Sequence, residues 1–313
     1  MSALQAQLGE YLRLRRALGF KLVEAGHVLP QFVAFLQTAG AETITVELAV
    51  AWARQPENAQ PIHWAHRLGA VRGFARWLAS IDPATEVPPA GVFAARQHRR
   101  APYIYTSDEL ATLVDAARPL LRPPLRAASY QALFGLLACS GMRLGEAITL
   151  DRPDVDLDEG LVTVRHAKYG RERLVPLHRT ATDALRGYAT ERDRLCPAPD
   201  CGRFFLSGHG GPLTLSGTDH TFTRLADTLG LRTPTRRPRI HDIRHTVTVQ
   251  ILTGWYRGDV EDIAARLPLL STLLGHVNPA SLYWYLSAVP ELMQLAAARL
   301  PDRAAAMMPG ARS

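Results

Sequence analysis

The feature that most constrains the fold of this chain is a short break in an otherwise helical pattern. Residues 81–91, IDPATEVPPAG, contain three prolines and a glycine, which interrupt a helix. Helical spacing of apolar residues ends before this segment and resumes after it. At 313 residues with 47% hydrophobic content, the chain is long and apolar enough for two packed cores. The sequence therefore predicts two domains with a connector between them.

The first predicted domain, residues 1–95, has a helical pattern throughout. In its last helix the apolar residues recur three and four positions apart, at Trp64, Leu68, Val71, Phe74 and Leu78. The same helix carries three arginines, most of them off the apolar stripe: Arg67, Arg72 and Arg76. Such arginines either face solvent or contact nucleic-acid phosphates, and both interpretations remain open. We treat them as candidates for DNA binding.

A basic segment, residues 96–102, joins the two predicted domains. Its Arg99 and Arg100 are further candidates, because a proline-rich and then cationic connector can follow a DNA backbone. The whole chain is basic as well, with a net charge of +7 and a pI near 9.7. This charge favours a polyanion as partner, and nucleic acid more than a membrane surface.

The sequence does not support a membrane span or a secretory signal. No run of eighteen apolar residues occurs, and the N-terminal stretch is amphipathic with charges inside it. Three cysteines, Cys139, Cys196 and Cys201, are too few for a disulfide framework, which agrees with a reducing compartment. We therefore expect a cytoplasmic protein associated with the nucleoid.

The second predicted domain, residues 103–313, opens with a helix start and contains one β-hairpin. Thr106 and Glu109 have the spacing of a capping box at the first turn of a helix. Between residues 154 and 177 the helical pattern gives way to strict alternation, with turn residues before and after it. This change predicts two short strands in an otherwise helical domain.

Two basic residues occupy turns in this domain. Lys168 lies at the tip of the predicted hairpin, and it is one of only two lysines, with Lys21, among 36 basic residues. Lysine can give up its proton and arginine cannot, so Lys168 is a candidate for proton transfer, against the alternative of an ordinary turn lysine. Arg143 stands between two glycines at a predicted helix start, with Glu146 three residues on, where it could bind a phosphate.

A third motif, HDIRH, places His241, Arg244 and His245 on one face of a helix. Two histidines four residues apart also occur in zinc proteases, where a glutamate follows the first histidine. Here that position is Asp242, a shorter side chain, and Arg244 would set a permanent cation beside the metal. The one close pair of cysteines likewise has no second pair at ligand spacing. We therefore predict no metal site.

The fourth motif is LLGHVNPASLYWYL, residues 273–286, with His276 before an Asn-Pro break. Asn278 can cap a helix that runs through both tyrosines. At about 100° per residue, Tyr283 and Tyr285 point roughly 200° apart, so at most one can share a pocket with His276. Tyr285 lies at the edge of the inward apolar stripe, but helical phase alone does not select it as a functional residue.

Together these motifs resemble those of the tyrosine recombinases, the family of phage integrases and Xer-type recombinases. The matching residues, in the order of the family, are Arg143, Lys168, His241, Arg244, His276 and a tyrosine shortly after it. The resemblance covers the whole chain. It implies a mainly α fold with a small β-sheet, in which residues 1–95 form a helical, SAM-like core-binding domain and residues 103–313 an α+β catalytic domain.

The resemblance implies a reaction in which a tyrosine hydroxyl attacks a DNA phosphodiester and leaves a 3′-phosphotyrosine. The family's interval from His276 selects Tyr285 as this nucleophile. Arg143 and Arg244 then clamp the non-bridging oxygens of the phosphate, as suits a reaction governed by positioning and electrostatics. Lys168 protonates the leaving 5′-oxygen.

The remaining motif residues receive supporting roles. His241 accepts or relays the proton of the nucleophile, and His276 donates a hydrogen bond to a phosphate oxygen. Glu146 orients an arginine or a histidine, and His245 either supports the site or is a satisfied core histidine. Because the covalent intermediate stores the bond energy, no cofactor and no metal are expected.

The family also exchanges strands between two double-stranded DNA sites within a tetramer, through a Holliday junction. The helix after Tyr285 would dock on a neighbouring protomer, a like copy or a related recombinase, or else pack on its own subunit. The connection from Arg244 to His276 is longer than usual in the family, which favours a transposon-borne or integrative-element recombinase. A non-cutting accessory subunit and a type IB topoisomerase-like enzyme are the alternatives.

Overall fold

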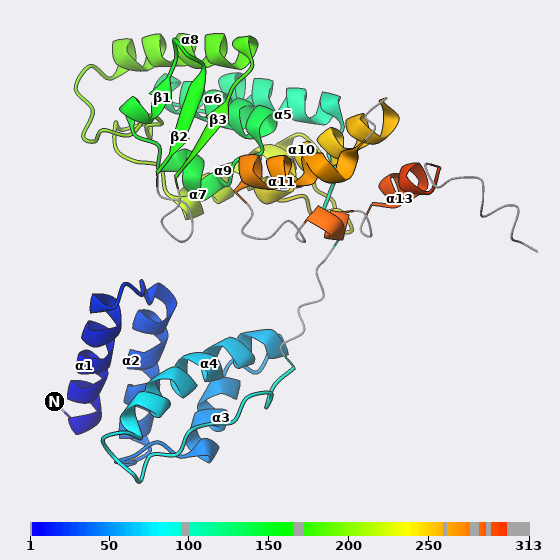
Figure 1. The fold of residues 1–313 in the computed structure, drawn as a ribbon. Helices are drawn as coiled ribbons and strands as arrows, with labels where there is room; N and C mark the ends of the chain where they lie inside the picture. The colour runs from blue at the N-terminus through cyan, green and yellow to red at the C-terminus, as the bar shows by residue number, and fades with distance from the viewer. Residues whose placement is uncertain are drawn as a thin grey trace, which may run out of the picture. The chain divides into compact units, whose positions relative to one another are not determined.

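The computed structural model describes residues 2–94, 101–165, 172–258, 262–275, 282–285 and 289–298. The chain divides into two compact units, Met1–Arg100 and Ala101–Ser313, and each is described by itself (Figure 1). Five residues from the sequence analysis lie outside the described ranges: Arg99, Arg100, Lys168, His276 and Asn278. Their roles remain predictions.

The first unit is helical. It contains α1 (Ala3–Ala17), α2 (Val23–Thr38), α3 (Val46–Arg54) and α4 (Pro61–Leu78). Side-chain caps start two of these helices, since Ser2 accepts a hydrogen bond from an α1 backbone N–H and Thr45 accepts one from α3. The core is aromatic, with Phe32, Trp52 and Phe74 almost fully buried.

The second unit combines helices with a small sheet. The longer helices are α5 (Ser107–Leu120), α6 (Pro124–Ser140), α8 (Arg179–Leu195), α9 (Leu215–Thr228), α10 (Ile240–Arg257), α11 (Ile263–Leu274) and α13 (Pro290–Ala297). A short helix, α7 (Leu144–Ile148), follows α6, and residues 282–285 are also helical. The predicted capping box of α5 is confirmed, because Thr106 and Glu109 exchange side-chain to backbone hydrogen bonds of 3.0 and 3.1 Å.

The sheet has three antiparallel strands in the order β1 (Val155–Asp156), β2 (Leu161–Val164) and β3 (Arg173–Pro176). Strands β2 and β3 are the predicted hairpin, with Val162 opposite Val175. The strand β1 was not predicted, because its two residues are too few to show an alternating pattern. The mainly α fold with a small sheet is confirmed.

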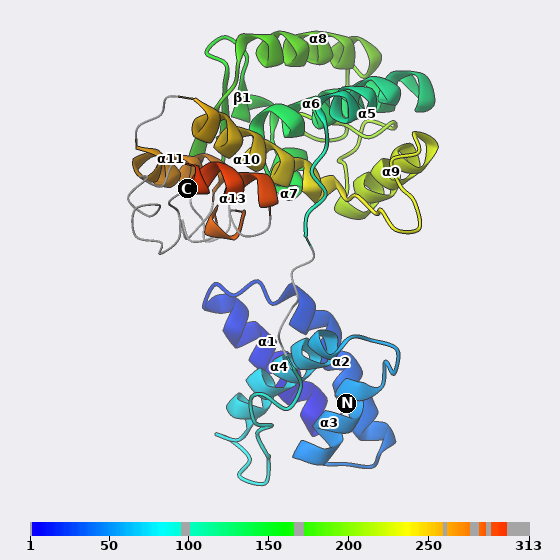
Figure 2. The ribbon, with the colours of Figure 1, turned by 90° about the vertical axis from the view of Figure 1, so that its right-hand side faces the viewer.

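Two hydrophobic clusters position the functional residues of this unit. The larger one is centred on α6, which packs between α5 and α8 and receives Val162, Val164 and Val175 from the sheet (Figure 1). The smaller one joins α10, α11, the 282–285 helix and α13, and Figure 2 shows α13 alongside α10. None of the described helices combines the length and apolar character that a membrane crossing requires.

Candidate active site

The end of α11 is the point at which three arginines from separate elements meet. Three consecutive backbone carbonyls there each accept a hydrogen bond from a different guanidinium: Leu273 from Arg173 at 3.0 Å, Leu274 from Arg244 at 2.7 Å, and Gly275 from Arg143 at 2.7 Å. The last carbonyls of a helix have no partner within the helix and carry its negative end. This negative end helps to hold three cations together directly before residue 276.

Arg143 and Arg244 reach this point for different local reasons. Helix α6 ends at Gly141, whose φ of +63° turns the chain, and Arg143 is the residue that precedes α7. Arg244 lies one turn into α10, is 3% exposed, and also donates to the Gly141 carbonyl at 2.8 Å. Desolvation, and then the nearby Arg143, lower the pKa of Arg244 to about 10. It remains a cation at neutral pH, surrounded by carbonyls.

Glu146 holds two of the arginines together. Its carboxylate accepts hydrogen bonds from Arg143 at 2.8 Å and from Arg173 at 2.7 and 3.2 Å. Burial favours the neutral acid, but the two arginines outweigh it and lower the pKa of the carboxyl. These contacts support the predicted orienting role of Glu146.

Sequence reasoning missed Arg173, although a signal was present. Arg173 and Val175 are two residues apart on β3 and therefore lie on the same face of the strand, and Val175 is fully buried. An arginine on the inward face of a strand calls for a buried partner. The partner, Glu146, lies 27 positions earlier in the chain, so the sequence pattern did not identify it.

The two tyrosines of the fourth motif differ in burial as the helical phase predicted. Tyr285 is 2% exposed and Tyr283 is 56% exposed. The Tyr285 hydroxyl lies 2.7 Å from Nδ1 of His245, and the two rings are 5.5 Å apart. His245 is thus in direct contact with the predicted nucleophile.

His241 and His245 form a pair one turn apart on α10. Their rings pack edge to face with centroids 4.8 Å apart, and His241 is the more exposed of the two. Desolvation and the neighbouring His241 lower the pKa of His245 to about 4, and desolvation and Arg244 lower the pKa of His241. Both are neutral at pH 7, and neutral imidazole can accept a proton.

We expect His245 to make stability depend on pH between about 6.5 and 4. Because its pKa is near 6.5 in an unfolded chain and about 4 in the fold, its stabilising contribution is present above pH 6.5 and is lost as the pH falls. Discounted for partial solvent access, the loss is up to about 2 kcal/mol. His245→Asn, which keeps an acceptor near Nδ1 but does not titrate, should flatten the melting temperature over this range. Equal slopes in both proteins would contradict this assignment.

The predicted DNA-binding arginines of α4 are partly engaged inside the first unit. Arg67 stacks over Trp52 at 3.8 Å and donates to its carbonyl, and Arg72 donates to the carbonyls of Pro88 and Pro89 at 2.9 Å each. These contacts support a structural role for Arg67 and Arg72. Arg76 is exposed and makes no ion pair with another described residue.

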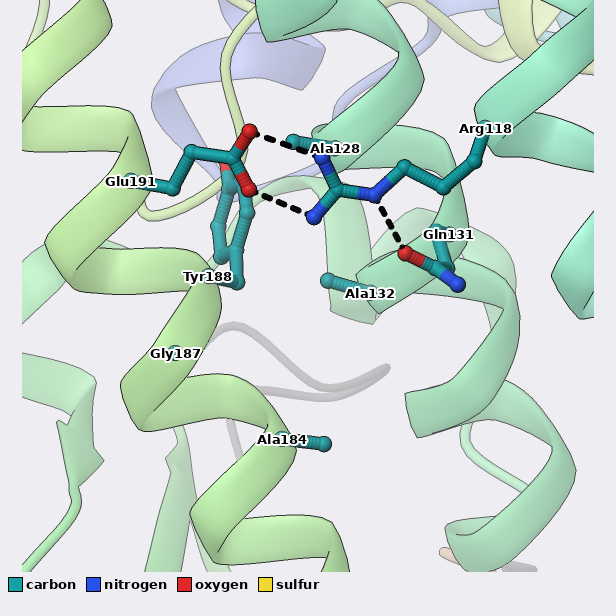
Figure 3. Close-up of a pocket in the computed structure, with 8 residues that line it drawn as sticks. All are labelled: Arg118, Ala128, Gln131, Ala132, Ala184, Gly187, Tyr188 and Glu191. Atoms are coloured by element: carbon teal, nitrogen blue, oxygen red, sulfur yellow. Dashed lines mark hydrogen bonds and ion pairs between the residues drawn. The ribbon is translucent and has the colours of Figure 1, made fainter.

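The described residues contain no group of three or more His, Cys, Asp or Glu side chains arranged to hold a metal ion. A pocket between α5, α6 and α8 has none of the predicted site residues in its lining (Figure 3). Its polar wall is formed by Arg118, which pairs with Glu191 at 2.7 and 2.5 Å and with Gln131 at 2.6 Å. Alanines, a glycine and Tyr188 line the remainder, and the Tyr188 hydroxyl hydrogen-bonds to Ser129 and to the Phe204 carbonyl.

The chain is similar in sequence to integrases and tyrosine recombinases. The model of the Phage integrase family matches residues 104–291. The putative integrase/recombinase y4rB of Sinorhizobium fredii is 43% identical over 310 residues, which cover 97% of this chain and 98% of that protein. Tyrosine recombinase XerD of Chlorobaculum tepidum is 29% identical over 215 residues, which cover 68% of this chain and 66% of that protein.

Solved structures share the fold at low sequence identity. The Tn1549 transposon integrase in complex with a circular intermediate DNA matches with a TM-score of 0.62 and 15% identity, covering 92% of this chain and 98% of that one. A lambda integrase tetramer bound to a Holliday junction matches with a TM-score of 0.58 and 18% identity, covering 88% and 78%. At these identities the likeness concerns the fold alone.

Proposed function

Since this chain belongs to the phage integrase family and is a site-specific tyrosine recombinase, we propose that it cleaves and rejoins DNA through Tyr285. One observation carries the proposal. Arg244 and His245 are neighbours on α10, and Arg244 binds the end of α11 beside Arg143 while His245 binds the Tyr285 hydroxyl. The adjacent residues Arg244 and His245 thereby link the two arginines proposed to bind phosphate, Arg143 and Arg244, to the proposed nucleophile Tyr285.

In the proposed reaction, a bond forms between Tyr285 Oη and phosphorus while the bond from phosphorus to the 5′-oxygen breaks. Making phenolate at neutral pH costs roughly 4 kcal/mol from a pKa near 10. Arg143 and Arg244 offset this cost by stabilising charge on the phosphate oxygens. The hydroxyl proton passes to the pair His245 and His241, whose proton affinity rises when an anionic phosphate binds beside them.

The leaving 5′-oxygen takes a proton from Lys168, and His276 donates a hydrogen bond to the phosphate, as the resemblance implies. Rejoining reverses each step, so the cycle needs no cofactor. The resulting 3′-phosphotyrosine preserves the energy of the phosphodiester bond. Lys168 and His276 complete the proposed set of catalytic residues.

We also propose that the protein acts as a homo-tetramer on two paired DNA sites, in the cytoplasm on the nucleoid. The fold shared with a lambda integrase tetramer on a Holliday junction supports this assembly. Helix α13 packs on α10 of its own chain through the buried Leu292, with an ion pair between Arg257 and Glu291. Docking on a neighbouring protomer then requires α13 to leave this position.

The first unit is proposed to bind the core of the site, with the basic segment at residues 96–102 along the backbone. Arg76, Arg99 and Arg100 are the arginines proposed to contact phosphate. The relationship to y4rB and the fold shared with a transposon integrase support a role in moving a mobile element. The names of these relatives do not favour the non-cutting subunit or the topoisomerase-like enzyme.

The test uses nicked suicide duplexes tiled over the DNA on either side of the gene. After cleavage, the short fragment that carries the free 5′-hydroxyl dissociates, so rejoining is not possible and the enzyme stays bound to the DNA. We therefore expect a covalent protein–DNA adduct, visible as a shifted band on a denaturing gel. Strand joining between two duplexes, without relaxation of an unrelated supercoiled plasmid, identifies a recombinase. A protein that binds a duplex tightly but never forms an adduct on it would overturn the proposal.

A further inference from the structure

Arg173, like Arg143, touches both the Glu146 carboxylate and the end of α11. Its side chain is 8% exposed and donates three hydrogen bonds, two to Glu146 and one, from Nε, to the Leu273 carbonyl. A guanidinium can make such contacts on two sides because its donors form a rigid planar fork. The side chain therefore fixes α7 relative to the last turn of α11.

The charges around Glu146 give this contact a further consequence. Three guanidiniums, Arg143, Arg173 and Arg244, surround one carboxylate, so the cluster carries an excess of two positive charges. With Arg173 present, Glu146 divides its acceptors between two arginines. Without it, Glu146 would close on Arg143 as a one-to-one ion pair, which lowers the potential that attracts an anion.

Close packing places Arg173 against the turn before residue 276. A Cβ added to Gly275 would lie 2.7 Å from Nη1 of Arg173, and the glycine has a φ of +69°. Glycine at this position lets the guanidinium lie directly on the backbone. Arg173 also begins β3, the strand that follows the segment containing Lys168.

We propose that Arg173 is a positioning residue of the cleavage reaction, which holds Arg143 through Glu146 and the turn before His276 through the Leu273 carbonyl. It does not itself touch the phosphate. The inference rests on the proposed function, because it assumes that Arg143 and His276 act on the scissile phosphate. It predicts a defect in the rate of cleavage and not in the binding of DNA.

The test is the single-turnover rate of adduct formation on a nicked duplex that the wild-type protein cleaves, measured over a range of protein concentrations. For Arg173→Gln we expect the maximal rate to fall about 100-fold, as misplacement of a catalytic group by about 1 Å does, with half-saturation within about threefold of the wild type. Arg173→Lys can pair with Glu146 but cannot reach Leu273 as well, so we expect a loss of about tenfold.

A double-mutant cycle separates positioning from simple loss of stability. Because Arg173 is proposed to act partly through Arg143, adding Arg173→Gln to Arg143→Gln should slow cleavage by much less than the about 100-fold expected when Arg143 is present. Additive losses would overturn the proposal, as would a wild-type rate in Arg173→Lys. Should Arg173→Gln fail to fold, by its melting curve, the same cycle with Arg173→Lys decides the matter.

Arg118→Gln is the matched control, because Arg118 also forms a two-bond pair with a glutamate, Glu191, but lines the separate pocket of Figure 3. We expect its cleavage rate to equal that of the wild type. An equal loss of cleavage rate in Arg118→Gln and Arg173→Gln would show that Arg173 forms only a structural ion pair and does not position the site. Failure of the wild type to form any adduct would instead contradict the proposed function.

Discussion

We expect Tyr285→Phe to abolish adduct formation, whereas Tyr283→Phe should form the adduct at a rate within about threefold of the wild type. The first change removes the hydroxyl that bonds to phosphorus, so no covalent product is possible. The second removes a hydroxyl from a side chain that is 56% exposed. Both are measured on the nicked duplex, with the shifted band on a denaturing gel as the readout.

The fold of Tyr285→Phe should be nearly intact, because the ring stays in the cluster formed by α10, α11 and α13. The 2.7 Å contact with His245 is lost, at a cost of about 1 kcal/mol. A normal melting curve together with an inactive protein therefore assigns the loss to chemistry. If Tyr285→Phe forms the adduct and Tyr283→Phe does not, the proposed nucleophile is wrong.

Arg244→Gln should slow adduct formation by about 1000-fold, the second of the two largest effects. The arginine is 3% exposed and donates to two carbonyls, and a guanidinium has five N–H groups in all. Glutamine has no charge with which to stabilise the pentavalent phosphate. We expect the loss in the maximal rate, with half-saturation for DNA changed much less.

Stability should change less than activity in this variant, because two effects oppose each other. Two buried carbonyls lose a charged donor, which costs about 1.5–3 kcal/mol for each hydrogen bond. The substitution also removes the desolvation cost of a buried cation whose pKa is lowered to about 10. This gain in stability is of similar order to the loss of the two hydrogen bonds. A folded Arg244→Gln protein with more than a tenth of the wild-type rate would show that Arg244 is not a phosphate ligand.

A substrate with a methyl group in place of one non-bridging oxygen provides a further check on Arg244. Its phosphate has no negative charge, so the transition state carries less charge for an arginine to stabilise. The difference between Arg244→Gln and the wild type should therefore shrink on this substrate. An undiminished difference would indicate that Arg244 acts on the fold and not on the phosphate.

Several elements were predictable because their causes are local. The capping box at Thr106 and Glu109 depends on atoms three residues apart, and the β2–β3 hairpin depends on alternation along the chain. The different burial of Tyr283 and Tyr285 follows from helical phase alone. For such features the sequence contains both partners within one or two turns.

Other contacts could not be predicted because their partners are far apart in the chain. The Gly275 carbonyl and Arg143 are separated by 132 positions, and His245 and Tyr285 by 40. Arg67 of α4 is another example: it lies off the apolar stripe of its helix, yet it stacks on Trp52 of α3. Helical periodicity does not describe such a neighbour.

The sequence by itself determined the residue types, their order and the local elements that present them, and from these the family and the proposed reaction. Only the tertiary structure decided that three arginines share the end of α11 and that His245, adjacent to Arg244, receives the Tyr285 hydroxyl. The physical reason is that a buried cation or hydroxyl binds whichever acceptor the packing of distant elements brings within hydrogen-bond distance. The packing of α7, β3, α10 and α11 makes that choice in this protein.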